Sequence, residues 1–168
     1  MGYILKILLN IFDYFTLKKV LKKIKLLIGK DFSIAIDVGS HHGEYILSLK
    51  KNFNIKKIYG FEPNPDAFKI LKKNTINYSL INIFNYGIAD IEGEKILNQN
   101  IESSSSSINS LNKNSKYYKK KYFLFNFLNL KKVSNSIKIK AINLGSFIEE
   151  KKIDKIDLLK IDTEGYEF

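Results

Sequence analysis

The chain has 168 residues and carries 28 Lys+Arg against 17 Asp+Glu, a formal net charge of +11, and every one of its basic residues is lysine. A hydrophobic fraction of 45% with a mean hydropathy of -0.16 excludes a wholly disordered chain and suits one domain with a single core. The absence of cysteine excludes disulfides, thiolate metal sites and a cysteine nucleophile. Positive charge can attract nucleic acid or an anionic membrane. Because arginine, the better phosphate and guanine ligand, is absent, we interpret the excess as a lysine-rich surface and expect no specific nucleic-acid partner.

Residues 1–30 are predicted to form a separate N-terminal unit, a basic amphipathic helix that ends near Gly29. Its apolar positions follow i, i+3, i+4, i+7 spacing, with lysines mainly on the other side; they are Leu17, Val20, Leu21, Ile24 and Ile28. Such a helix can make peripheral contact with a membrane surface, or it can pack on the following domain. We favour packing, because amphipathic helices in globular proteins usually face a core.

The apolar segment that precedes this helix resembles neither a signal peptide nor a membrane span. Lys6, Asn10 and Asp13 interrupt it, and no small-residue cleavage site follows. No charge-free apolar run reaches the ~18 residues that a spanning helix needs. We therefore expect a cytoplasmic protein.

Residues 31–168 are predicted to form an α/β domain. Short apolar strands are expected over 33–38, 57–61 and 80–86, separated by helices that begin at Gly43 and at Asn64. The second helix has a strong start, with Asn64 as its cap, Pro65 in its first position and Asp66 in its first turn. The order strand, helix, strand, helix, strand predicts parallel strands joined by right-handed crossovers.

The second half of the chain departs from this alternation. Residues 90–94 read as a turn and 95–97 as a returning strand, which predicts an inserted hairpin. The serine run 103–107 is interpreted as a linker in preference to a substrate loop, and the basic aromatic stretch 117–130 as an amphipathic insertion in preference to a base-stacking surface. A half-exposed strand over 136–141, a helix over 146–152 and a fourth parallel strand over 155–162 complete the prediction.

The informative motifs follow predicted strands, at the carboxyl edge where open parallel sheets bind ligands. After the first strand, residues 37–43 read D-x-G-x-x-x-G, whose glycines allow close approach to a ligand and begin a helix. Glu62 follows Gly43 by 19 residues, close to the ~20-residue offset of a ribose-binding acid. Pro63 and Pro65 restrict the backbone beside it. The alternative is that Glu62 only helps to cap the next helix. Neither G-x-G-x-x-G nor G-K-[ST] is present, which disfavours dinucleotide oxidoreductases and P-loop enzymes.

Three blocks of the sequence resemble the FkbM family of S-adenosylmethionine-dependent methyltransferases. They are I-D-V-G at 36–39 with Gly43, G-F-E-P-N at 60–64, and L-K-I-D-T-E-G-Y-E at 159–167. The resemblance implies a Rossmann-like class I methyltransferase fold, with a mostly parallel sheet and helices on both faces. It implies S-adenosyl-L-methionine as cofactor and O-methylation of a hydroxyl on a sugar, glycolipid or related metabolite.

The resemblance also implies roles for individual residues. Cofactor-binding positions would be Asp37, Gly39, Ser40, His41 and Gly43 around the methionine part, Glu62 with Pro63 and Asn64 at the ribose, and Gly87, Ile88, Ala89 and Asp90 along the adenine. The catalytic candidates Lys160, Asp162 and Glu164 would face the transferred methyl group and the acceptor. A complete domain of this kind would continue with about three further strands after the Asp162 strand, so we expect this chain to be C-terminally truncated.

Methyl transfer from a sulfonium needs an aligned acceptor oxygen and a base for the hydroxyl proton. Asp162 is the first candidate for that base and Glu164 the second; alternatively, both orient Lys160 or bind the cofactor's amino group. His41 and His42 could also act as base, although a loop histidine bonded to backbone or cofactor is the favoured interpretation. No His, Asp and Glu spacing predicts a metal site. Two other functions stay open, a non-catalytic remnant that binds the cofactor and a basic module for nucleic acid or membrane surfaces.

Overall fold

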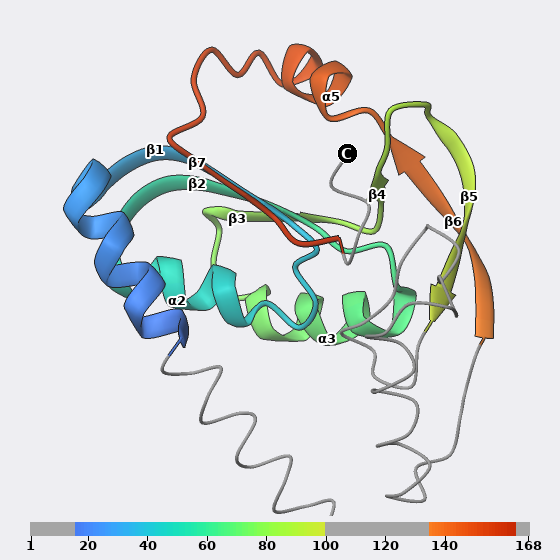
Figure 1. Ribbon diagram of the computed structural model, residues 1–168, viewed down its shortest axis with the longest axis horizontal. Helices are drawn as coiled ribbons and strands as arrows, with labels where there is room; N and C mark the ends of the chain where they lie inside the picture. Colours follow the sequence, from blue (N-terminus) through green and yellow to red (C-terminus); the bar gives the residue numbers. More distant parts are fainter. Residues whose placement is uncertain (1–15, 100–134, 164–168) are drawn as a thin grey trace, which may run out of the picture.

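The computed structural model describes residues 16–99 and 135–163. Its main sheet has four strands in the order β3-β2-β1-β7, all parallel. The strands are β1 (Asp31–Val38), β2 (Asn54–Phe61), β3 (Ile81–Phe84) and β7 (Leu158–Ile161). Helices α2 (Glu44–Asn52) and α3 (Pro65–Thr75) connect the first three strands and cover one face, while α5 (Leu144–Glu150) lies on the other (Figure 1). This arrangement confirms the predicted α/β fold with helices on both faces.

A separate apolar cluster fills each side of the sheet. On the α2 side, Ala35 and Ile58 from the strands meet Ile46 and Leu49 from α2 and Leu71 from α3, all of them buried. The second cluster lies on the α5 side and contains Ile36, Val38, Tyr59, Phe61, Phe147 and Ile153. Strands covered on both faces read as continuous apolar runs, which explains why the centres of β1 and β2 lack polar alternation.

The helix over 16–28 packs on the domain, as the favoured interpretation predicts. Leu21 is buried in the first cluster, and Leu17 and Ile24 lie against it. The predicted apolar face is only partly used, because Val20 and Ile28 are exposed. Within the described part of the chain, no helix is both long and apolar enough to span a membrane.

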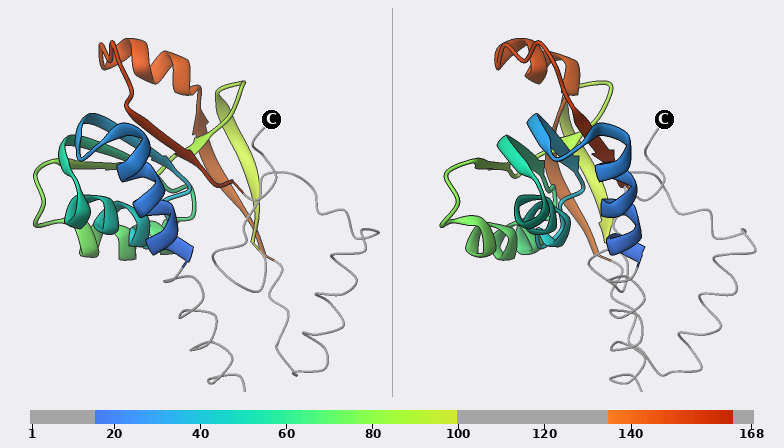
Figure 2. Two further views of the ribbon diagram at one scale, coloured as in Figure 1. Left: turned by 60° about the vertical axis from the view of Figure 1, so that its left-hand side comes forward. Right: turned by 90° about the vertical axis from the view of Figure 1, so that its left-hand side faces the viewer.

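A second sheet of three strands lies beside the main one (Figures 1 and 2). It contains β4 (Gly87–Ile88), β5 (Gly93–Gln99) and β6 (Asn135–Ile142) in the order β4-β6-β5. The predicted hairpin is therefore wrong, because the turn 90–94 joins β4 and β5, which flank β6 and do not pair with each other. Asn143, a residue far along the chain, stabilises this turn. Glu92 Oε1 accepts from the Asn143 N–H at 3.1 Å, and Asn143 Nδ2 donates to the Asp90 carbonyl at 3.0 Å.

Several element boundaries also differ from the sequence prediction, and two of them have a clear local cause. Helix α5 begins at Leu144 and not at Ser146, because the Asn143 side chain caps it by accepting from the Ser146 N–H at 3.1 Å. Strand β2 begins at Asn54, three residues before the predicted start, where it pairs with the beginning of β1. The serine run 103–107 and the stretch 117–130 lie outside the described residues.

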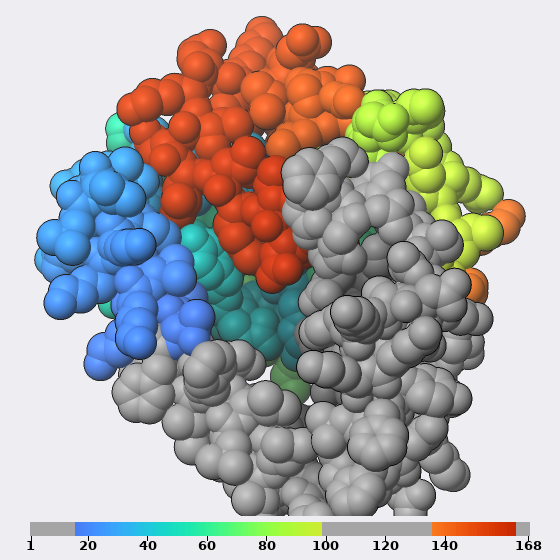
Figure 3. Space-filling view, viewed as in Figure 1, coloured from blue at the N-terminus to red at the C-terminus, as the bar shows by residue number. Residues whose placement is uncertain are grey.

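Strand β7 forms one edge of the main sheet in the described part of the chain, where β1 is its neighbour. Figure 3 shows this red segment at the surface, between the blue N-terminal helix and the orange α5. Leu159 and Ile161 are each 44% exposed there.

Candidate cofactor and catalytic site

The carboxyl ends of β1, β2 and β7 meet at one edge of the sheet. Val38 lies beside Phe61 on one side and Ile161 on the other, so the loops that follow these strands are neighbours. The amides of Gly39 and Ser40 both donate to the Phe61 carbonyl at 2.9 Å. This register brings the glycine loop (residues 39–43) against the Glu62 turn, as the sequence predicts, and against Asp162.

The glycines of the loop allow close packing within the protein. Gly39 has φ 80° and Gly43 has φ 90°, both in the left-handed region. A Cβ on Gly39 would overlap the carbonyl oxygen of Asp162, and one on Gly43 would lie 2.8 Å from Leu71 Cδ1. Gly39 therefore packs against Asp162, just after β7, and Gly43 packs against α3. The close approach of this loop to a ligand stays a prediction.

Asp37 and Lys160 form an ion pair beneath the glycine loop. Asp37 is fully buried, and its Oδ1 lies 3.0 Å from Lys160 Nζ. The same ammonium group donates to the Gly39 carbonyl at 3.0 Å. Burial raises the pKa of the Asp37 carboxyl, and the Lys160 charge acts in the opposite direction. Lys160 thus fastens the loop to β7 while compensating a buried carboxylate.

The structure describes two of the three predicted catalytic residues. Asp162 Oδ2 lies 3.6 Å from Lys160 Nζ, and the Asp162 side chain is 62% exposed. Whether Asp162 acts as the base or orients Lys160 stays a prediction. Tyr45 also lies near this ammonium group, with its ring centroid 5.6 Å from Lys160 Nζ. Burial raises the pKa of the Tyr45 hydroxyl to about 12, and the Asp37 charge acts in the same direction. Glu164 lies outside the described residues.

Glu62 connects the glycine loop to the start of α3. Its Oε2 accepts from the His41 N–H at 2.7 Å and its Oε1 from the Asn64 N–H at 2.9 Å. Glu62 is 7% exposed, and burial raises the pKa of its carboxyl against the opposing effect of these two bonds. Because a carboxylate oxygen accepts about two hydrogen bonds, each oxygen keeps one acceptor position.

The start of α3 confirms the predicted cap. Asn64 Oδ1 accepts from the amides of Asp66 at 3.0 Å and Ala67 at 3.5 Å, and Pro65 occupies the first helical position. Asn64 is buried, so its side chain serves the helix. Pro63 contributes its carbonyl, which accepts from Asn85 Nδ2 at 3.1 Å.

Asn85 belongs to the same edge of the sheet, and the sequence interpretation missed it. Its Nδ2 also donates to the Glu62 carbonyl at 2.8 Å. The predicted strand 80–86 includes Asn85, whereas β3 ends at Phe84, so the overlong strand prediction concealed this residue. The predicted adenine segment, Gly87 to Asp90, follows as β4 and the turn beyond it. Gly87 and Ala89 are buried there, and the Ala89 N–H donates to the Ile142 carbonyl at 3.0 Å.

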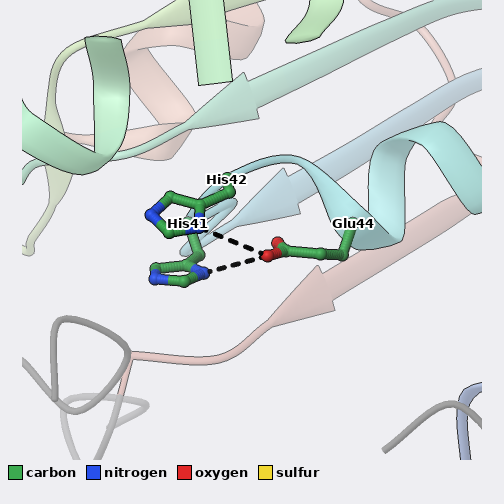
Figure 4. Close-up of side chains that lie close together, drawn as sticks. All are labelled: His41, His42 and Glu44. Atoms are coloured by element: carbon green, nitrogen blue, oxygen red, sulfur yellow. Dashed lines mark hydrogen bonds and ion pairs between the residues drawn. The ribbon is translucent and has the colours of Figure 1, made fainter. Parts of the chain in front are cut away.

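Three further loop residues, Ser40, His41 and His42, precede α2. Ser40 is buried and donates from Oγ to the Asp37 carbonyl at 3.0 Å, which tightens the turn. The ring nitrogens Nδ1 of His41 and His42 lie 3.3 and 3.5 Å from Glu44 Oε1 (Figure 4). These three side chains are the one group of possible metal ligands within residues 16–99 and 135–163.

An open parallel sheet with a glycine turn after β1 and a buried acid after β2 is typical of the Rossmann-like class of folds. The family follows from comparison, because the model of the methyltransferase FkbM domain matches residues 37–168. The chain belongs to this family.

Comparison with solved structures finds the crystal structure of methyltransferase FkbM from Methylobacillus flagellatus KT. The match has 14% sequence identity and a TM-score of 0.30, and it covers 37% of this chain and 18% of that chain. The similarity therefore spans less than a fifth of the length of that protein. No curated protein matches the chain.

Proposed function

We propose that this chain binds S-adenosyl-L-methionine and contributes to an O-methyltransferase acting on a hydroxyl of a sugar, glycolipid or related metabolite. The observation that carries the proposal is the placement of Glu62. A nearly buried carboxylate at the carboxyl edge of the sheet, with one acceptor position left on each oxygen, suits the two neighbouring hydroxyls of a ribose.

The residues around Glu62 fit such a cofactor. Hydrogen bonds hold the glycine loop: the Gly39 and Ser40 amides donate to the Phe61 carbonyl, and the Gly39 carbonyl accepts from Lys160. The buried Asp37 carboxylate lies next to this loop. It forms an ion pair with Lys160, but neither of its oxygens has a hydrogen-bond partner of good geometry among the described residues. We assign the methionine part to the loop, the ribose to Glu62 and the adenine to the Gly87–Asp90 segment.

The bound cofactor would supply an electrophilic methyl group, so the protein's main task is alignment of the acceptor oxygen. Asp162 is our candidate for accepting the hydroxyl proton, because its carboxylate is exposed at the edge where β7 ends. Lys160 acts through the loop that it fastens, since its ammonium group lies on Asp37 and Gly39. We keep Glu164 as the second candidate base.

Calorimetric titration with S-adenosylhomocysteine tests the cofactor assignment. Each lost hydrogen bond to a charged acceptor is worth about 1.5–3 kcal/mol, so Glu62→Ala should bind about tenfold more weakly or worse. Glu94→Gln on β5 is a matched control for the loss of a carboxylate, because Glu94 is exposed. The proposal fails if the parent chain does not bind, or if Glu62→Ala, shown to be folded by its thermal melt, binds equally well.

As a separate proposal, the helix over 16–28 makes peripheral contact with a membrane surface. We propose that the protein is otherwise cytoplasmic and has no specific nucleic-acid partner. It is supported by Leu26 and Leu27, which are 76% and 79% exposed beside several lysines. Flotation with anionic vesicles should recover the parent chain, and Leu26→Ser with Leu27→Ser should reduce recovery. Equal recovery of both proteins would contradict it.

A further inference from the structure

We propose that His41, His42 and Glu44 form a binding site for a divalent transition-metal ion of the zinc type, at the start of α2. The three side chains come from four consecutive positions, where the glycine loop turns into the helix (Figure 4). Neither the FkbM resemblance nor the proposed methyl transfer requires this ion, although His41 and His42 belong to the loop that we assign to the methionine part of the cofactor.

The distance from each histidine to Glu44 suits one ion. His41 Nδ1 and His42 Nδ1 lie 3.3 and 3.5 Å from Glu44 Oε1, and one possible ligand atom from each of the three residues lies within 4.8 Å of the other two. Ligands on a tetrahedral ion with bonds of about 2.0–2.2 Å are about 3.3–3.6 Å apart. Two imidazoles and one carboxylate also form a ligand set that zinc uses when it keeps a fourth position for water.

The backbone explains how adjacent histidines reach the same oxygen. His41 has φ 48°, a left-handed conformation that is uncommon for a residue with a Cβ. The two rings stack with centroids 3.6 Å apart and an angle of 26° between their planes. The loop therefore holds both rings on one side of Glu44 (Figure 4).

Loading the site requires a local rearrangement. The coordinating lone pair of a ring nitrogen lies in the plane of the ring, so two nearly parallel rings cannot both direct one at the same ion. One imidazole must turn about χ2, a torsion with broad minima in histidine. With the side chains of His41 and His42 26% and 29% exposed and that of Glu44 60% exposed, this turn is possible at the surface.

Two features limit the affinity. The positive end of the α2 dipole disfavours a cation, although the Glu44 carboxylate opposes it. An exposed site with three ligands also leaves water on the ion. We therefore expect micromolar binding.

Composition makes the test selective, because the chain has two histidines and no cysteine. Any imidazole-bound ion on the untagged protein must use His41 or His42. Titration of the untagged chain with Zn²⁺ should show one site, and Co²⁺ should give the visible absorption of a tetrahedral ion with nitrogen and oxygen ligands.

His42→Phe keeps a ring to stack on His41 but removes one ligand, and Glu44→Gln removes the carboxylate charge. Each should weaken Zn²⁺ binding by about tenfold or more, since even outer partners of a metal site cost 10–100-fold when they are lost. Glu94→Gln is the matched control and should bind as the parent does. Thermal melts in a chelator establish that each variant is folded. The proposal is overturned if the parent does not bind Zn²⁺, or if folded His42→Phe and Glu44→Gln bind it as tightly as Glu94→Gln.

Discussion

Replacement of Lys160 by methionine tests whether the buried ion pair holds the glycine loop in place. Methionine retains much of the apolar stem but removes the ammonium group that lies 3.0 Å from Asp37 Oδ1 and from the Gly39 carbonyl. Because Asp37 is fully buried, its carboxylate would lose its compensating charge. Removing one partner of a buried pair costs about 3–5 kcal/mol. At about 2–4 °C per kcal/mol for a chain of this size, the melting temperature should fall by about 6–20 °C.

Thermal and urea unfolding, followed by circular dichroism, measure this loss. Lys69→Met is the matched control, because Lys69 and Asp66 form an ion pair at 3.1 Å in which both side chains are more than three-quarters exposed. That variant should melt close to the parent, since exposed pairs contribute little. Asp37→Asn combined with Lys160→Met removes the uncompensated charge and should recover part of the stability.

Two results would refute this reasoning. One is a Lys160→Met variant that unfolds at the same urea concentration as Lys69→Met. The other is a double variant whose loss equals the sum of the two single losses, because residues that interact directly should show coupling of about 0.5–3 kcal/mol.

Three further predictions concern a glycine, a carboxyl group and a helix cap. Gly29→Ala should destabilise the protein by about 1–2 kcal/mol through left-handed strain alone, because Gly29 (φ 86°) has open space at its Cβ position. Gly39→Ala should destabilise it more, because its Cβ would also overlap the Asp162 carbonyl oxygen. Equal losses in urea unfolding would contradict the packing argument. The hydrogen bond from Lys155, with those from two β1 amides, lowers the pKa of Asp157 to about 2 from 3.8. A depressed carboxyl pKa contributes stability above 3.8 that is lost as the pH falls towards about 2, so Asp157→Asn should flatten the dependence of the urea midpoint on pH in this interval; an unchanged slope would argue against it. Asn64→Ala should cost about 0.5–2 kcal/mol through loss of the α3 cap, and a melt identical to the parent's would show that the cap is dispensable.

Local chemistry explains why much of the fold could be predicted. The α3 start is encoded by Asn64, Pro65 and Asp66, which act within one turn, and the structure confirms it. The parallel order of the first three strands follows from their helical connections. The proximity of the glycine loop to Glu62 follows in turn, because parallel strands end at the same edge of a sheet.

Pairing between distant segments could not be predicted in this way. The turn 90–94 has the composition of a hairpin, yet β5 pairs with β6, which lies more than 30 residues further along the chain. Strand pairing depends on which edges meet after the chain has folded, and a local turn signal does not contain that information.

The candidate site shows the same difference between local and long-range information. By itself, the sequence indicated where the strands end, and so it predicted Asp37, Glu62 and Asp162 at one edge; Lys160 followed from the family resemblance. Only the tertiary structure decided what those side chains contact: Lys160 lies on Asp37 and the Gly39 carbonyl, and Glu62 lies between two loops. The physical reason is that position along a strand is set by local periodicity, whereas a buried charge takes whichever partner the packed elements bring within about 3 Å.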